Sequence, residues 1–293
     1  MPLAEVRGIH INYEVIGEGG AWVSLSPGSR RPYDELVPIA RALAAEGHRV
    51  LLHDRRNCGA SDVAIEGEES EYEIWADDLH ALLQHLGARS AFVGGSSAGC
   101  RLAILFALRH PEAAKGLLLW RVTGGHTAAE RLAETYYGQF IEAARRGGMA
   151  AVCDTEHFRE RIEARPENRA RLIAMRPEEF IRVMSHWKDY FTRGADQPVI
   201  GASEADLRSI RAPVLLVPGN DVIHTPVTAE AVARLFPRNE VHHVVAQGRG
   251  PGGGLLEDWD RAEWKAAEGE LARLFGDFIR RVEAAPAETA GAG

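Results

Sequence analysis

The chain has 293 residues, and its composition excludes several classes of protein. Hydrophobic residues make up 45% of it and charged residues 26%, and 42 Asp and Glu against 34 Lys and Arg give a net charge of −8. These fractions are ordinary for a globular protein. An acidic balance offers no basic field for nucleic acid or an anionic membrane surface, and no apolar run approaches the ~18 residues of a membrane span. We therefore expect neither a nucleic-acid partner nor a membrane partner.

The cysteines and the missing motifs narrow the class further. Three cysteines, Cys58, Cys100 and Cys153, are odd in number and lack metal-ligand spacing, which is typical of reduced thiols. The first residues do not resemble a signal peptide, so we expect a cytoplasmic protein. Neither a phosphate-binding glycine loop nor a metal-ligand cluster is found. We expect no cofactor and no metal.

Hydrophobic patterning in the first half of the chain predicts strands and helices in alternation. Residues 6–15 alternate apolar and polar side chains around a glycine, which predicts an antiparallel hairpin at a sheet edge. Short apolar runs predict strands at 22–25, 50–52, 91–93 and 116–122, and helical spacing predicts helices at 33–46, 70–86 and about 100–110. This rhythm indicates βαβ units and a parallel sheet.

The alternation breaks between residues 123 and 205, where only helical patterns occur. It resumes with strands at 213–217 and 240–246 and a last helix at 259–279. An all-helical insert of roughly 80 residues predicts a cap over the carboxyl edge of the sheet, where open α/β sheets bind ligands. We divide the chain into a core (1–122 and 206–283), a cap (123–205) and a tail (284–293) whose composition predicts disorder.

A serine between two glycines lies where the strand at 91–93 gives way to a helix. The stretch reads Gly95-Ser96-Ser97-Ala98-Gly99, which is the nucleophile-elbow pattern G-x-S-x-G. A sharp strand-to-helix turn strains the serine backbone and leaves no room for side chains two residues away on either side. The turn raises the hydroxyl above the sheet and directs N–H groups of the helix toward an oxyanion beside it.

Together these features resemble the α/β-hydrolase superfamily over almost the whole chain. The resemblance rests on a Pro27-Gly28-Ser29 turn, an Asp54-x-Arg56…Gly59-x-Ser61-Asp62 loop, the elbow, the position of the insert and Gly219-Asn220-Asp221. It implies a doubly wound, mostly parallel sheet of about eight strands. It further implies Ser97 as the nucleophile, Asp221 as the acid, and the N–H groups of Ser29 and Ala98 as the oxyanion hole.

The general base is the point at which this sequence departs from the family. In the family a histidine follows the last strand, often within Gly-His-Gly-Pro, whereas here the stretch is Gln247-Gly248-Arg249-Gly250-Pro251. Arginine does not lose its proton and cannot act as a base. His224, three residues after Asp221, is our first candidate for the base, and His126 at the start of the insert is the second.

Several functions remain open on these residues. The first is a cofactor-independent serine hydrolase acting on a small ester, thioester or lactone, with Arg30, Arg249 and His126 as candidate substrate-binding residues. The second keeps the fold but uses Arg249 for lyase, isomerase or C–C bond-cleaving chemistry. The third is a catalytically inactive protein that binds a small ligand under the cap. In each case the partner is a small molecule, and a homodimer is left open for the assembly.

Overall fold

The fold is centred on one eight-stranded sheet. The computed structural model describes residues 2–285, and the strand order across the sheet is β1-β2-β4-β3-β5-β6-β7-β8. The pairs β1–β2 and β2–β4 are antiparallel and all the others are parallel. The strands are β1 (Leu3–Val6), β2 (Ile9–Ile16), β3 (Trp22–Ser26), β4 (Arg49–His53), β5 (Ala91–Ser96), β6 (Ala114–Trp120), β7 (Val214–Val217) and β8 (Asn239–Val241). This confirms the predicted doubly wound, mostly parallel α/β fold with its edge hairpin.

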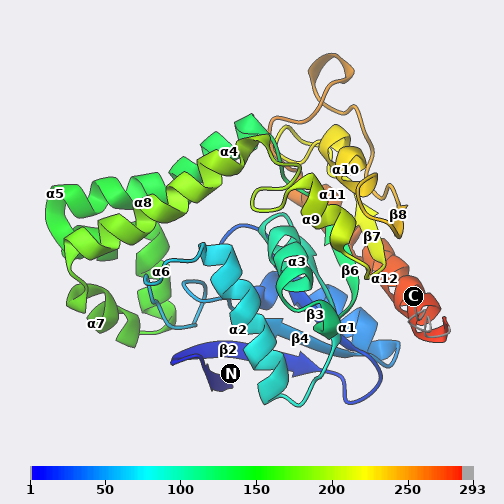
Figure 1. Cartoon of the computed structure of the whole chain (residues 1–293), viewed down its shortest axis with the longest axis horizontal. Coiled ribbons are helices and arrows are strands. Elements are labelled where there is room, and N and C mark those ends of the chain that lie inside the picture. The colour runs from blue at the N-terminus through cyan, green and yellow to red at the C-terminus, as the bar shows by residue number, and fades with distance from the viewer. Residues whose placement is uncertain (1, 286–293) are drawn as a thin grey trace.

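Helices cover both faces of the sheet (Figure 1). Helices α2 (Glu71–His85), α3 (Ala98–Arg109) and α10 (Pro226–Ala233) contribute to one hydrophobic cluster, and α1 (Val37–Ala45) and α12 (Glu268–Ala284) contribute to a second. Neighbouring strand residues divide between the clusters, as Leu117 belongs to the first and Leu118 to the second. This division follows from the period of two in a strand, which sends successive side chains to opposite faces.

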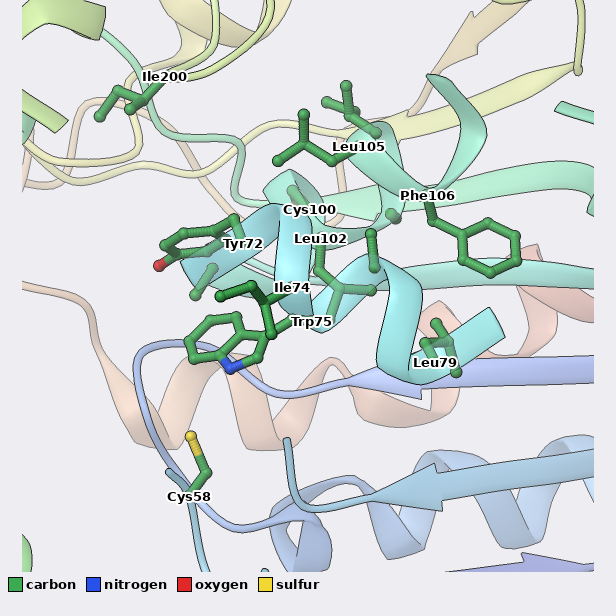
Figure 2. Close-up of a cluster of buried hydrophobic side chains, with 14 of the residues drawn as sticks. Cys58, Tyr72, Ile74, Trp75, Leu79, Cys100, Leu102, Leu105, Phe106 and Ile200 are labelled. Carbon is green, nitrogen blue, oxygen red and sulfur yellow. The ribbon is translucent and has the colours of Figure 1, made fainter. Parts of the chain in front are cut away.

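The first cluster fixes the helix that follows the elbow. Figure 2 shows side chains of α2, including Tyr72 and Trp75, gathered with side chains of α3, including Leu102 and Phe106. All four are at most 2% exposed. Because interiors are packed as densely as organic crystals, this contact leaves α3 little freedom to move. The N-terminus of α3 is thereby held in place beside Ser97.

Helices alone fill most of the segment that we predicted as a cap. They are α4 (His126–Ala133), α5 (Gln139–Cys153), α6 (Glu156–Ala164), α7 (Glu167–Ala174) and α8 (Pro177–Arg193), with α9 (Glu204–Ser209) leading back to the sheet. A π-helical turn at Glu134–Gly138 joins α4 to α5. Figure 1 shows α8 running alongside α4 and α5, on one side of the sheet.

The structure differs from the sequence-based expectation near the C-terminus. The predicted strand 240–246 is in the structure the three-residue β8, which pairs with residues 214–216 of β7, and residues 242–246 belong to no strand. The predicted helix 259–279 is two helices, α11 (Arg261–Ala266) and α12, and α11 begins where the Asp260 carboxylate accepts hydrogen bonds from the N–H groups of Ala262 and Glu263. Of the predicted tail 284–293, residues 286–293 lie outside the described residues. No helix in the described part of the chain is long and apolar enough to cross a membrane.

Candidate active site

The two glycines of the elbow are required by close backbone contacts. A Cβ atom added to Gly95 would lie 2.4 Å from the Ser26 carbonyl oxygen, and one added to Gly99 would lie 2.2 Å from the same oxygen. Real Cβ atoms do not approach so closely. The strand β3 therefore passes directly against the turn, and only glycine at both positions permits the turn to form.

Ser97 has the strained backbone that the elbow pattern predicts. Its φ of 52° and ψ of −106° lie outside the regions that side-chain-bearing residues prefer. Ala98 is the first residue of α3, where backbone N–H groups have no partner within the helix. Ser29 also has a positive φ of 46°, and a Cβ on the preceding Gly28 would lie 3.5 Å from the Cβ of Ser97. The Gly28–Ser29 turn and the start of α3 thus lie on either side of the serine.

A tight turn after β7 brings His224 back over Asp221. The Asp221 carboxylate accepts hydrogen bonds from the backbone N–H groups of Ile223 and His224, both at 3.0 Å. A Cβ on Gly219 would lie 2.5 Å from the Cβ of His224, so glycine is needed to close the turn. The Thr225 hydroxyl then caps α10. The sequence therefore folds this segment locally so that residues three apart face each other.

His224 bridges Asp221 and Ser97. Its Nδ1 lies 2.8 Å and 2.9 Å from the two carboxylate oxygens of Asp221, and its Nε2 lies 2.9 Å from Ser97 Oγ. When the imidazole carries its proton on Nδ1, that N–H donates a hydrogen bond to Asp221. Nε2 is then free to accept the hydroxyl proton of the serine. The arrangement is that of a nucleophile, a base and an orienting acid, with acid and base supplied by the same loop.

Burial and charge keep His224 neutral. Burial is the largest influence and, with the positive charge of Arg121, lowers its pKa to about 4, although the Asp221 carboxylate acts in the opposite direction. Burial would raise the pKa of Asp221, but its hydrogen bond with His224 and the charges of His224 and Arg121 outweigh burial and lower that pKa to about 2. At neutral pH the pair is an ionised carboxylate beside a neutral imidazole, which is the state in which a histidine can act as a base.

A cavity of about 700 Å³ opens onto the serine. Its wall includes Ser29, Ser97, His224 and the aromatic side chains of Trp120 and Trp259. The cap contributes residues of α4 and of the π-helical turn, Arg131, Leu132, Thr135 and Tyr136. This size suits a small organic molecule.

Arg121 is a residue at the site that our sequence analysis did not single out. It directly follows β6, its φ is 61°, and it is 5% exposed. Its guanidinium lies 4.2 Å from the ring centre of Trp259 and 5.5 Å from that of Trp264, and Nη2 lies 3.1 Å from Nδ1 of His224. The available signal was an arginine at the carboxyl end of a buried strand, where parallel sheets gather their site residues.

The three predicted substrate-binding residues lie elsewhere. Arg30 is buried, pairs with Glu71 at 2.5 Å and is absent from the cavity wall. The Arg249 side chain is 46% exposed and pairs with Glu263, and the His126 side chain is 67% exposed and pairs with Asp196. Neither lines the cavity. The prediction that Arg30 binds substrate is wrong, because the π-helical turn and α2 enclose its side chain, with Tyr137 as its aromatic partner and Glu71 as its ionic partner.

The elbow cysteine is a packed thiol. Cys100 Sγ lies 3.0 Å from the carbonyl oxygens of Gly95 and Trp120, and burial raises its pKa to about 12. A thiol reacts as its thiolate, so Cys100 is not a nucleophile at neutral pH. Within residues 2–285, no group of three or more His, Cys, Asp or Glu side chains is placed to hold a metal ion.

Comparison with known proteins identifies the family. The family described as alpha/beta hydrolase fold matches residues 26–249, which is most of the chain and includes the elbow and the Asp221–His224 turn. The chain belongs to the alpha/beta-hydrolase-fold family.

Individual relatives are more distant. The chain is 33% identical over 108 residues to the uncharacterized hydrolase YraK of Bacillus subtilis, covering 37% of this chain and 39% of that protein. It is 30% identical over 119 residues to the proline iminopeptidase of Lactobacillus helveticus, covering 38% of this chain and 40% of that protein. The chain thus matches about two fifths of these relatives' length. A thermophilic esterase from Thermogutta terrifontis has a similar fold, with a TM-score of 0.62 and 24% identity over 96% of this chain and 97% of that one.

Proposed function

We propose that the protein is a cofactor-independent serine hydrolase that cleaves a small ester, thioester or lactone through an acyl-enzyme. The observation that carries this proposal is the unbroken chain of contacts from Asp221 through His224 to Ser97, with separations of 2.8 Å and 2.9 Å. A serine hydroxyl is a weak nucleophile until a base accepts its proton. This contact supplies a base in place of the histidine that the family has where Arg249 stands in this chain.

The proposed reaction has two halves. In the first, Ser97 Oγ attacks the carbonyl carbon, its proton moves to His224 Nε2, and the oxyanion is held by the N–H groups of Ala98 and Ser29. The leaving group takes the proton from His224, and it departs as the alcohol or thiol from an ester or thioester, or stays on the acyl chain as a hydroxyl from a lactone. In the second, water attacks the acyl-enzyme and gives a proton to His224, which passes a proton back to Ser97 Oγ as the acid is released. Asp221 keeps the imidazole in the required tautomer throughout.

The other functions considered for the sequence have less support. Chemistry that depends on Arg249 requires that residue to reach the substrate, and its side chain pairs with Glu263 outside the cavity wall. An inactive binding protein has no need of the strained backbone at Ser97, which has a cost of order 1–3 kcal/mol. Family membership and the names of relatives, a hydrolase and a peptidase, agree with hydrolysis.

The test is the turnover of simple acyl substrates by matched variants. p-Nitrophenyl esters of increasing chain length, a thioester and a lactone are offered to the wild type, Ser97→Ala and His224→Gln. We expect turnover of at least one class, with both substitutions lowering kcat by about 10³-fold or more. Cys100→Ser serves as a matched control beside the elbow and is expected to retain the activity. Turnover that survives Ser97→Ala would overturn the proposal.

A further inference from the structure

Arg121 presents a cationic group to the cavity with unused hydrogen-bonding capacity. It lies on the cavity wall with Ser97 and His224. Its Nε is buried and has no hydrogen-bond partner, and its Nη1 and Nη2 lie 3.5 Å from Ser96 Oγ and from Asp221 Oδ2. Hydrogen bonds to charged groups are usually shorter than 3 Å. The guanidinium is therefore only loosely bound by the protein's own oxygens.

Asp221 does not give Arg121 a short hydrogen bond, because both of its carboxylate oxygens already accept hydrogen bonds from other groups. Both of its oxygens face Nδ1 of His224 at under 3 Å, and Oδ1 also accepts two backbone N–H groups. The remaining close contact of Arg121, 3.1 Å from its Nη2 to Nδ1 of His224, sets two donors against each other when Nδ1 carries its proton. An acceptor supplied from the cavity would relieve that conflict.

The charged groups with the largest influence on His224 are two guanidiniums and one carboxylate, which is a local excess of one positive charge. Arg121 is 5% exposed and Arg101 is fully buried, and both act electrostatically on His224. Arg101 donates to the hydroxyl groups of Thr123 and Tyr72 rather than to a carboxylate. Asp221 is the carboxylate with the largest influence on Arg121. Glu35, also on the cavity wall and only partly buried, acts on Arg121 more weakly and is paired with Arg31.

We propose that Arg121 binds a carboxylate of the substrate, so that the preferred substrate is an acyl compound carrying one negative charge away from the scissile bond. This rests on the proposed function, because it places the substrate's carbonyl at Ser97. A guanidinium offers parallel N–H donors that match the two oxygens of a carboxylate. One such group would neutralise the excess charge and fill the open donor positions together.

The tryptophan beside Arg121 fits a binding role. Trp259 lies 4.2 Å from the Arg121 guanidinium and 5.1 Å from that of Arg261. Stacking on an aromatic face holds the guanidinium plane and leaves its edge donors free for a planar acceptor. A carboxylate that binds along that edge would be held in a fixed orientation by two parallel hydrogen bonds. This contact would orient the rest of the substrate across the cavity.

The test compares charged and neutral esters of matched length. Mono-p-nitrophenyl adipate and p-nitrophenyl heptanoate are hydrolysed by the wild type, Arg121→Lys, Arg121→Met and Arg249→Met, with the spontaneous rate subtracted. We expect the wild type to favour the carboxylated ester by roughly tenfold or more in kcat/KM, mainly through KM. Arg121→Met should abolish this preference, Arg121→Lys should retain part of it, and the exposed Arg249→Met should retain it fully. Equal kcat/KM values in the wild type, or a preference that survives Arg121→Met, would overturn the proposal.

A binding measurement separates this proposal from the proposed hydrolysis. Adipate is titrated calorimetrically into Ser97→Ala, which lacks the nucleophile, and into Ser97→Ala combined with Arg121→Met. Binding to the first protein, with at least tenfold weaker binding to the second, supports the carboxylate site even if no ester is turned over. Turnover of esters without any binding or charge preference would leave the hydrolase in place and refute the role of Arg121. Circular dichroism of each variant confirms that the fold is intact.

Discussion

The pH dependence of serine reactivity tests the environment of His224 most specifically. A base must be neutral to accept a proton, and burial together with Arg121 lowers the pKa of this imidazole from 6.5 to about 4. That difference corresponds to roughly 3 kcal/mol in favour of the neutral ring. The rate of inactivation by a fluorophosphonate should therefore stay nearly constant from pH 7 down to about 5 and reach half its plateau value near pH 4. With an ordinary histidine the rate would already be at half its plateau value near pH 6.5.

The variant Arg121→Met should shift this pH profile in a defined direction. Removing the neighbouring cation makes protonation of His224 easier, so the acidic limb should move to higher pH. Burial, the larger influence, remains in the variant, and the midpoint should stay between about 4 and 6.5. The assay is the second-order inactivation rate measured by intact mass from pH 3.5 to 9, with circular dichroism to confirm folding at each pH. A wild-type limb centred near 6.5, or one that Arg121→Met leaves in place, would refute the reasoning.

Three further substitutions test the parts of the site separately. Gly99→Ala places a Cβ 2.2 Å from the Ser26 carbonyl oxygen, and we expect a loss of about 1–3 kcal/mol in urea unfolding; an unchanged midpoint would contradict the elbow contact. Asp221→Asn should reduce fluorophosphonate labelling by about 10³-fold or more through the wrong imidazole tautomer, and labelling at the wild-type rate would remove Asp221 from the mechanism. Glu71→Gln leaves the buried Arg30 without its counter-ion, so it should cost about 3–5 kcal/mol, seen as a clear fall in Tm; a Tm within a degree of wild type would contradict that pairing.

Much of the fold was predictable because it depends on local patterns. Apolar runs separated by segments of helical spacing predicted which parts of the chain form strands and which form helices. The glycines around Ser97 predicted the turn between β5 and α3. Asp221 and His224 could be proposed as neighbours because a turn brings residues three apart together. The early end of β8 could not be read in this way, since it depends on pairing with β7, which is distant in the sequence.

The contacts around Ser97, Asp221 and His224 were not predictable from the sequence. Arg121 meets Trp259 only because the loop before α11 folds back beside the end of β6, and no periodic pattern links residues so far apart. Arg30 directly follows the Gly28–Ser29 turn, yet its side chain contacts Glu71 on α2 and Tyr137 in the π-helical turn before α5. Arg249 follows the last strand but pairs with Glu263 on α11. Each outcome is decided by long-range packing.

The most direct test of the central claim is intact-mass analysis after treatment with a fluorophosphonate, which reports an activated serine without requiring the natural substrate. We expect a single adduct on the wild type, no adduct on Ser97→Ala and a rate lowered by about 10³-fold or more on His224→Ala. His126→Ala, which alters an exposed histidine outside the cavity wall, should be labelled like the wild type. No adduct on the wild type, or an adduct that forms at the same rate without His224, would contradict the account.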